Sequence, residues 1–364
     1  MSILDIGNKI DYNIYHCVRT DYYYANCSAC VDSCPEGAFL FKNQKVLFKN
    51  DLCTSCGGCI GGCPSEAIKM PSFDPNEYIL NFIGKEEKTL SSAKGLPALT
   101  VFDSHHFITA VLRKKCDITL EITPNEKIDY EANDSYHKNL LIQRVEQSNA
   151  FLTSLNVEFR VLIDEKKEET IQDSSRRTLF KSFGKKVAEK ALDVTAAHSE
   201  VKGIIPSQTI IPLKIALLKN SLKEFLDENE SYSEQISGHG LIINKNVDSS
   251  LCTNCGDCFS FCPTKAFNFS SDKEQLYFQS GKCIGCEICN EICPEKCITN
   301  EDSIDIVSYA FDRADKKVDH EVKVCRQCKL GFFARTAEKV SCHHCQNLND
   351  NFADLFVPEY MRKG

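Results

Sequence analysis

The sequence predicts a multidomain α+β protein in which two cysteine-rich modules flank a small α/β domain and a helical linker, with a short cysteine-rich tail at the end. Length is the first observation: at roughly 150 residues per domain, 364 residues predict two to four units. The second is the placement of the 22 cysteines, of which a single one, Cys116, lies between Cys63 and Cys252. The third is an alternation of strand and helix patterns in the cysteine-poor middle.

These observations give the expected boundaries: residues 1–75 and 233–312 for the two modules, 76–170 for the α/β domain, 171–232 for the linker and 313–364 for the tail.

Composition excludes several classes of protein. A hydrophobic fraction of 42% and a charged fraction of 26% are typical of globular proteins, and no apolar run is long enough to span a membrane. A net charge of -8 argues against binding to nucleic acid or to anionic lipid surfaces. The first residues lack the basic and apolar regions of a secretory signal, so we expect a cytoplasmic protein whose thiols serve metals rather than disulfides.

The cysteines of the two modules follow the pattern C-x2-C-x2-C-x3-C-P. Three copies are complete: Cys53, Cys56, Cys59 and Cys63; Cys252, Cys255, Cys258 and Cys262; and Cys283, Cys286, Cys289 and Cys293. A fourth copy has Cys27, Cys30 and Cys34, with Tyr24 in the leading position. Three thiolates at this spacing can bind three irons of one cubane, and the fourth, before the proline, reaches a neighbouring cluster. Zinc knuckles are the alternative, but they rarely need four cysteines so close together.

The four copies resemble the bacterial-type ferredoxins with two [4Fe–4S] clusters, and the resemblance occurs twice, over roughly residues 10–72 and 236–308. It implies two ferredoxin-like folds and assigns the ligands. In the second module, one cluster would be held by Cys252, Cys255, Cys258 and Cys293, and the other by Cys262, Cys283, Cys286 and Cys289. In the first module, Cys34, Cys53, Cys56 and Cys59 would hold one cluster, and Cys27, Cys30 and Cys63 would hold three corners of the last.

The fourth corner of that last cluster departs from the family pattern. Cys17 is the unused cysteine nearest in sequence, and we favour it as the ligand. The alternatives are His16, a [3Fe–4S] centre with an open corner, or loss of the cluster.

The tail carries two C-x2-C pairs, formed by Cys325, Cys328, Cys342 and Cys345. Four thiolates so arranged predict a zinc ribbon that folds around one Zn²⁺, with a mononuclear iron as the alternative. His343 and His344 are expected to be knuckle residues rather than ligands. Two cysteines remain: Cys297, which replaces an alanine of the repeat and is expected to pack beside a cluster, and Cys116, expected at a helix–strand junction.

Periodicity predicts the elements of the middle domain. We expect strands at 98–102, 117–122 and 157–163 and helices at 104–115 and 135–154, hence a small parallel sheet. No glycine-rich phosphate loop is present. His105 and His106 are expected to be structural residues at a helix start, with a ligand role at the sheet edge as the alternative.

The linker contains Arg176-Arg177, in a segment that looks like a twin-arginine export motif placed mid-chain. We interpret it as an amphipathic helix capped by Ser175, with Leu179 and Phe183 on its apolar face. A second helix is expected at 212–226.

Taken together, the motifs favour an iron–sulfur electron-transfer protein with up to four [4Fe–4S] clusters and no substrate site of its own. By resemblance, its partner would be a larger oxidoreductase, for example a molybdenum-dependent formate dehydrogenase. The alternative is a maturation factor that binds an apo-oxidoreductase through the α/β domain and the tail.

Overall fold

The computed structural model describes residues 9–22, 25–43, 45–92, 96–122, 135–165, 211–229, 232, 234–334, 339–342 and 345–346. Predictions made for Tyr24, for the helix around Arg176-Arg177 and for His343 and His344 lie outside the described residues.

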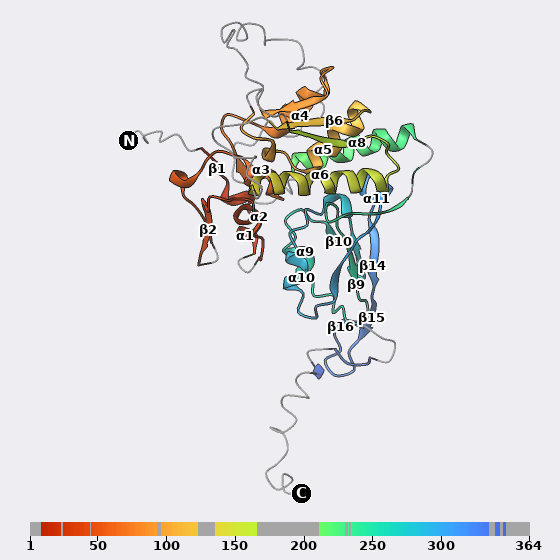
Figure 1. Ribbon diagram of the computed structural model, residues 1–364. Coiled ribbons are helices and arrows are strands. Elements are labelled where there is room, and N and C mark those ends of the chain that lie inside the picture. The colour runs from red at the N-terminus through yellow and green to blue at the C-terminus, as the bar shows by residue number, and fades with distance from the viewer. Residues whose placement is uncertain are drawn as a thin grey trace, which may run out of the picture.

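The first module is built from short hairpins and single-turn helices (Figure 1). The terminal strands β1 (Asp11–Tyr12) and β4 (Ile68–Lys69) pair antiparallel, as do the inner strands β2 (Phe39–Lys42) and β3 (Lys45–Phe48). The helices are α1 (Val18–Asp21), α2 (Ala29–Asp32) and α3 (Gly58–Gly62).

The second module repeats this plan. Strand β9 (Asn244–Val247) pairs with β12 (Ile298–Glu301), and β10 (Phe267–Phe269) pairs with β11 (Gln275–Phe278). It adds strands β8 (Gln235–Ser237), β13 (Ser303–Asp305) and β14 (Asp315–Asp319), of which β14 extends the β10–β11 hairpin. Its helices are α9 (Asp257–Ser260), α10 (Ile288–Ile292) and α11 (Ile306–Ala310). The structure therefore contains the same arrangement of strand pairs and short helices at two positions.

The middle of the chain folds as a three-stranded parallel sheet with helices. The sheet has the order β5 (Thr89–Ser91), β6 (Ile118–Ile122) and β7 (Val161–Glu165). The helices are α4 (Pro75–Ile83), α5 (Ser104–Lys114), α6 (Tyr136–Ser154) and α8 (Leu213–Glu228). Their starts follow from local chemistry: Asp74 caps α4 ahead of Pro75, and Asp103 with His106 forms a capping box on α5.

The parallel sheet and the helices at 104–115, 135–154 and 212–226 are confirmed, but the strand predicted at 98–102 is wrong. That segment forms a 3-10 helix, Leu99–Val101, and the first strand is β5. Leu99, Val101 and Phe102 are fully buried. A short apolar run reports burial on all sides and does not by itself distinguish a strand from a helix. The third strand also begins at Val161 rather than at residue 157.

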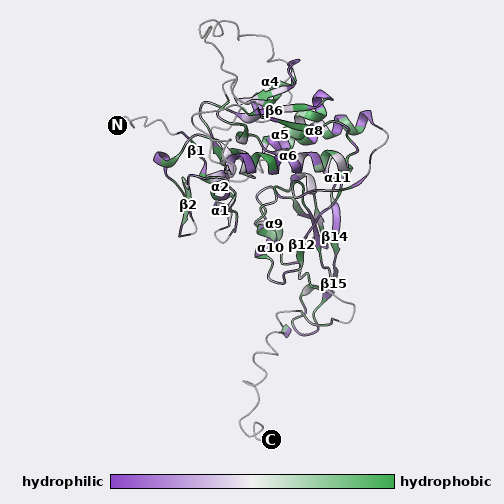
Figure 2. Cartoon of the chain, in the orientation of Figure 1, coloured by the Kyte–Doolittle hydropathy of each residue, from purple (hydrophilic) through white to green (hydrophobic). Residues whose placement is uncertain are grey.

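The hydrophobic core divides unevenly between the two modules. One core runs from the first module through the middle domain to α8, whose apolar side packs on α5 (Figure 2). Most of the second module has a separate core that includes Phe267, Phe278 and Val318. A third apolar cluster lies between the modules and is formed by Val18, Ala25, Ile215, Ile284 and Ile288.

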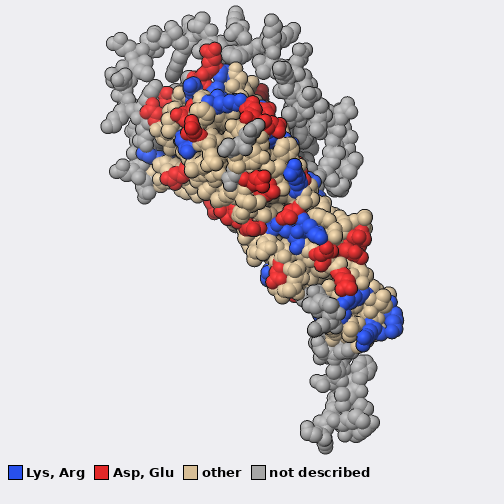
Figure 3. All heavy atoms as spheres, turned by 90° about the vertical axis from the view of Figure 1, so that its right-hand side faces the viewer, with Lys and Arg blue, Asp and Glu red and all other residues tan. Residues whose placement is uncertain are grey.

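The tail is an antiparallel hairpin, β15 (Glu321–Val324) and β16 (Gly331–Ala334), at the end of the second module far from the middle domain (Figure 1). On the face in Figure 3, acidic and basic side chains are interspersed. Within the ranges described above, no helix has the length and apolarity needed to cross a membrane.

Candidate metal centres

The same backbone turn closes all four cysteine motifs. After each Cys-Pro, the third residue beyond the cysteine adopts a left-handed conformation: Gly37, Glu66, Lys265 and Lys296, with φ between 50° and 61°. The alanine that follows is buried in the first three copies, and its N–H donates to the sulfur of the motif's last cysteine. These bonds are Ala38 to Cys34 (3.3 Å), Ala67 to Cys63 (3.3 Å) and Ala266 to Cys262 (3.2 Å). A hydrogen bond of this kind stabilises a thiolate that binds iron.

In the first module, one group of four thiols comprises Cys34, Cys53, Cys56 and Cys59, which we call site A. Burial raises the pKa of Cys59 well above its usual value, and the nearby thiols of Cys56, Cys34 and Cys53 add to the effect. The N–H of Ser55 donates to the Cys53 sulfur over 3.4 Å. The structure thus brings together four thiols that the sequence predicted as one ligand set.

The second group in this module comprises Cys17, Cys27, Cys30 and Cys63, which we call site B. Burial raises the pKa of Cys30 to about 12, and the thiols of Cys27, Cys63 and Cys17 are close enough to contribute. Cys17 reaches this position at the start of α1, where its side chain is hydrogen-bonded to Tyr12. The structure places Cys17 beside the three motif cysteines, and its role as a ligand stays a prediction.

In the second module, the thiols of Cys262, Cys283, Cys286 and Cys289 form a third group, which we call site C. Burial raises the pKa of Cys289 to about 12, and Cys283 and Cys262 contribute. The N–H of Gly285, whose φ is 67°, donates to the Cys283 sulfur over 3.4 Å.

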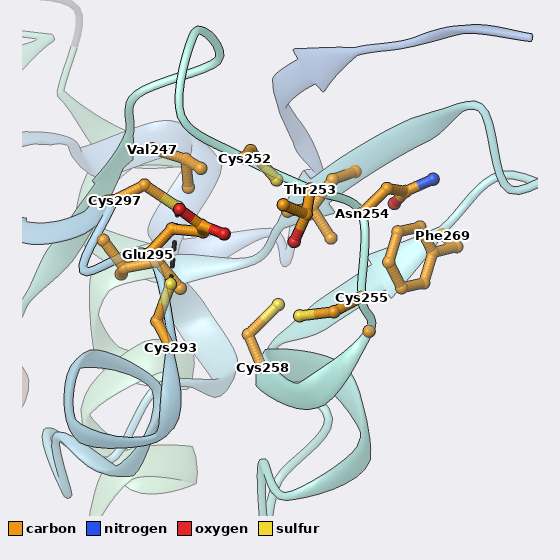
Figure 4. Close-up of a pocket in the computed structure, with 13 residues that line it drawn as sticks. Val247, Cys252, Thr253, Asn254, Cys255, Cys258, Phe269, Cys293, Glu295 and Cys297 are labelled. Atoms are coloured by element: carbon orange, nitrogen blue, oxygen red, sulfur yellow. Dashed lines mark hydrogen bonds between the residues drawn. The ribbon is translucent and has the colours of Figure 1, made fainter. Parts of the chain in front are cut away.

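The last group comprises Cys252, Cys255, Cys258 and Cys293, which we call site D. Figure 4 shows their sulfurs around one small pocket, with those of Cys255 and Cys258 pointing toward each other. Cys297, where the other copies have alanine, is buried, and its sulfur lies 3.4 Å from that of Cys293. It packs beside the candidate cluster site, as expected.

The donor sets fit iron–sulfur clusters. Each site offers four thiols, and soft thiolates select such clusters. Burial raises the pKa of at least two thiols in each site, so that thiolates there need a cationic partner such as iron.

Among the described residues, the sequence analysis missed two buried cations whose charge acts on thiols of these sites. Arg144 on α6 donates to the backbone oxygens of Thr100, Phe102 and Gly58, and its charge acts toward Cys59 and Cys56 of site A. Arg144 follows the apolar Leu141 by three residues, so the two share one face of the helix. This spacing could have predicted from the sequence that Arg144 is buried.

The second buried cation is Lys245 on β9, which is fully buried and acts on Cys283 and Cys289 of site C. The available signal is alternation along the strand, which places Lys245 on the same face as buried Val247.

The paired histidines at the start of α5 both contact one buried carboxylate. The Asp103 carboxylate accepts from the Lys214 ammonium at 2.6 Å and also contacts His105 and His106. Burial alone would raise the pKa of Asp103, but the charges of Lys214, His105 and His106 hold it well below its usual value. The ring of His106 also contacts the Asn76 side chain over 3.2 Å.

The tail gathers the cysteines predicted for it. The sulfurs of Cys325, Cys328, Cys342 and Cys345 all lie within 4.8 Å of one another. Hydrogen bonds from the backbone N–H groups of Cys342 and Cys328 lower the pKa of Cys325 to about 6. Four converging thiols fit a tetrahedral metal ion, and the donor set by itself does not distinguish zinc from iron.

Comparison with known proteins agrees with this chemistry. Residues 25–68 and 244–294 each match a family described as a 4Fe-4S dicluster domain. A segment of the chain is 42% identical over 45 residues to a ferredoxin of Methanothermococcus thermolithotrophicus and covers 75% of that protein. This chain belongs to the ferredoxin family.

Other ferredoxins match over part of their length. An uncharacterized ferredoxin of Methanocaldococcus jannaschii is 40% identical over 47 residues, which are 13% of this chain and 76% of that protein. The ferredoxin-type protein NapF of Haemophilus influenzae is 41% identical over 76 residues, or 20% of this chain, and the match spans only 42% of that relative's length. No solved structure matches this ferredoxin.

Proposed function

We propose that this ferredoxin carries four [4Fe–4S] clusters, at sites A to D, and passes single electrons along them. The observation that carries the proposal is the convergence of sixteen thiols into four sets that match the ligand sets of the family. When bound, the clusters supply one-electron redox chemistry. The chain itself supplies thiolate ligands, hydrogen bonds to sulfur and burial, which together set the potentials.

Contacts between thiols of neighbouring sites give the order of the four sites in space. Within the first module, the Cys30 thiol of site B acts on Cys59 of site A. Within the second, the Cys289 thiol of site C acts on Cys258 of site D. Each of these pairs is therefore close enough to interact electrostatically.

Between the modules, sites B and C face each other. Cys27 of site B and Cys286 of site C pack against the same apolar cluster and line the same cavity of about 460 Å³. The N–H of Asn26 donates to the Glu291 carboxylate over 3.2 Å, and the rings of Tyr22 and Phe261 meet at 5.8 Å. The order A–B–C–D follows, with B and C as the inner pair and A and D as the points where electrons enter and leave.

We further propose that the tail binds one Zn²⁺ and that the partner is a larger oxidoreductase, with molybdenum-dependent formate dehydrogenases as the first candidates. The partner class rests on resemblance to four-cluster electron-input subunits. Capture of the tagged chain from anaerobically grown cells tests it. Binding to an enzyme only in its cofactor-free form would instead favour a maturation factor.

Metal analysis tests the cluster assignment directly. Anaerobically purified protein is expected to contain about 16 iron, about 16 acid-labile sulfide and about one zinc per chain, since each cubane holds four irons. All the clusters should be reduced reversibly by one electron each in a dithionite titration followed by EPR. An iron content near 8 would contradict two loaded modules, and iron in the tail would overturn the zinc assignment.

A further inference from the structure

Lys245 presents an unusual electrostatic situation in the second module. Its side chain is fully buried, and its ammonium donates to the amide oxygens of Asn290, at 2.6 Å, and Asn300. Among the residues that the structure describes, no carboxylate forms an ion pair with it. A charge buried among neutral groups is strongly destabilising unless an opposite charge lies close by.

Site C offers such an opposite charge directly, whereas the Glu287 carboxylate reaches Lys245 only through the Asn300 side chain. Lys245 acts on the thiols of Cys283 and Cys289 and lowers their pKa against the burial that raises it. The Asn290 amide oxygen lies between the two, since it accepts from the Lys245 ammonium at 2.6 Å and is 3.3 Å from the Cys289 sulfur. A cluster held by four thiolates at site C would be the anion that balances Lys245.

Among the described residues, no lysine or arginine lines the pocket at site D. The largest influences on the Cys258 thiol are burial and the thiols of Cys252, Cys255 and Cys289. Lys219, the other buried cation near site C, is paired with Asp312, so the two sites of the second module differ by Lys245, a buried cation that forms no ion pair with a described carboxylate.

We propose that Lys245 sets the midpoint potential of the cluster at site C and holds it above that of the cluster at site D. The inference rests on the proposed function, because it requires both clusters to be present. In this transfer, a neighbouring cluster would be oxidised by one electron and the cluster at site C would be reduced by one electron. No bond forms or breaks. A fixed cation nearby stabilises the more negative, reduced cluster.

The test is an EPR-monitored redox titration of the full-length protein carrying Lys245→Gln. We expect one cluster to shift to a more negative midpoint. At the wild-type midpoint, its ratio of reduced to oxidised form should fall about tenfold, which is about 59 mV for one electron. The matched control is Lys273→Gln, which removes the same charge from an exposed position of the same module and should leave all midpoints unchanged.

A second variant covers the case in which Lys245→Gln does not load its cluster. Asn290→Asp keeps the lysine but places a carboxylate against its ammonium, so the same cluster should again shift to a more negative midpoint. Four loaded clusters with unchanged midpoints in either variant would overturn the proposal, as would loss of the site C cluster in both, since Lys245 would then retain the cluster rather than tune it. Failure of the proposed function is separate, because it appears as missing iron in the wild-type protein.

Discussion

The two ferredoxin modules share a motif and a pairing of strands but differ in what surrounds them. The first shares one hydrophobic core with the middle domain, whereas most of the second has a core of its own. Gly57 of the first module and Glu287 of the second occupy equivalent motif positions, and both are left-handed, with φ of 74° and 61°. A Cβ at Gly57 would lie 2.8 Å from the Val101 side chain, while Glu287 is exposed.

The cysteine spacing therefore determines the loop around a candidate cluster site but not the site's environment. The buried cation beside site A, Arg144, comes from a helix of the middle domain. The buried cation beside site C, Lys245, comes from a strand of the module itself. In each module, the positive charge beside the buried thiols therefore comes from a residue outside the cysteine motif.

Replacement of Cys17 tests the sharpest asymmetry between the modules. If Cys17 completes site B, Cys17→Ala leaves three thiolates, and one iron should be lost on oxidation. We expect an EPR signal of an oxidised [3Fe–4S] cluster at about one spin per chain, with the other three clusters unchanged. Cys116→Ala, a change at the junction of α5 and β6 outside every site, is the control. The ligand role is refuted if the Cys17→Ala spectrum matches the wild type.

The two buried lysines of α8, Lys214 and Lys219, should respond unequally to loss of their ion pairs. Asp103→Asn leaves the ammonium of Lys214 buried without its counter-charge and should lower the free energy of unfolding by about 3–5 kcal/mol. Asp312→Asn, at the second module, should lower it by only about 1–2 kcal/mol, because Asp312 is partly exposed to solvent. Anaerobic thermal unfolding measures both.

The pH dependence of the first effect follows from the lowered pKa of Asp103. The unfolded state binds its proton more tightly, so the stabilisation is fully present above the unfolded pKa of about 4 and is lost only below it. The difference between wild type and Asp103→Asn should therefore not decrease from pH 7 to pH 6. A difference that shrinks between these values would contradict a carboxylate paired in the folded state.

The paired left-handed positions give a smaller effect. Gly57→Ala forces a Cβ against Val101 and should lower the free energy of unfolding by about 1–3 kcal/mol and impair loading of site A. Glu287→Gly removes a Cβ from a left-handed position and should change stability by less than about 1 kcal/mol. An equal change in the free energy of unfolding for the two variants would mean that the Val101 side chain moves aside without destabilising the protein.

The smallest effect on the modules is expected from the tail. Cys342→Ser removes one of four converging thiols, so the protein should lose zinc and the hairpin of β15 and β16 should unfold. Cluster absorbance and iron content should be unchanged. A loss of cluster iron would place these cysteines in an iron–sulfur site.

Some features of the fold were predictable because they repeat in the sequence or have a clear period. The motif copies, the helix at 104–115 and the parallel sheet belong to this class. The strand predicted at 98–102 could not be distinguished from a buried 3-10 helix, since its burial comes from packing against α3 and α6, which the local sequence does not specify. The facing of sites B and C likewise depends on contacts between residues more than 250 positions apart, such as Asn26 with Glu291.

Helix α8 contacts the backbone beside both site B and site C and so sets the spacing between them. Near its start, the ammonium of Lys214 binds the backbone oxygen of Cys63, a predicted ligand of site B, and five residues later Lys219 binds that of Gly281, two residues before Cys283 of site C. At 1.5 Å per residue, the two lysines are about 7.5 Å apart along the axis. One inserted residue would turn Lys219 by about 100° and release one module. If electrons pass between sites B and C as proposed, the rate of transfer depends on the spacing of two lysines on a helix that supplies no predicted cluster ligand.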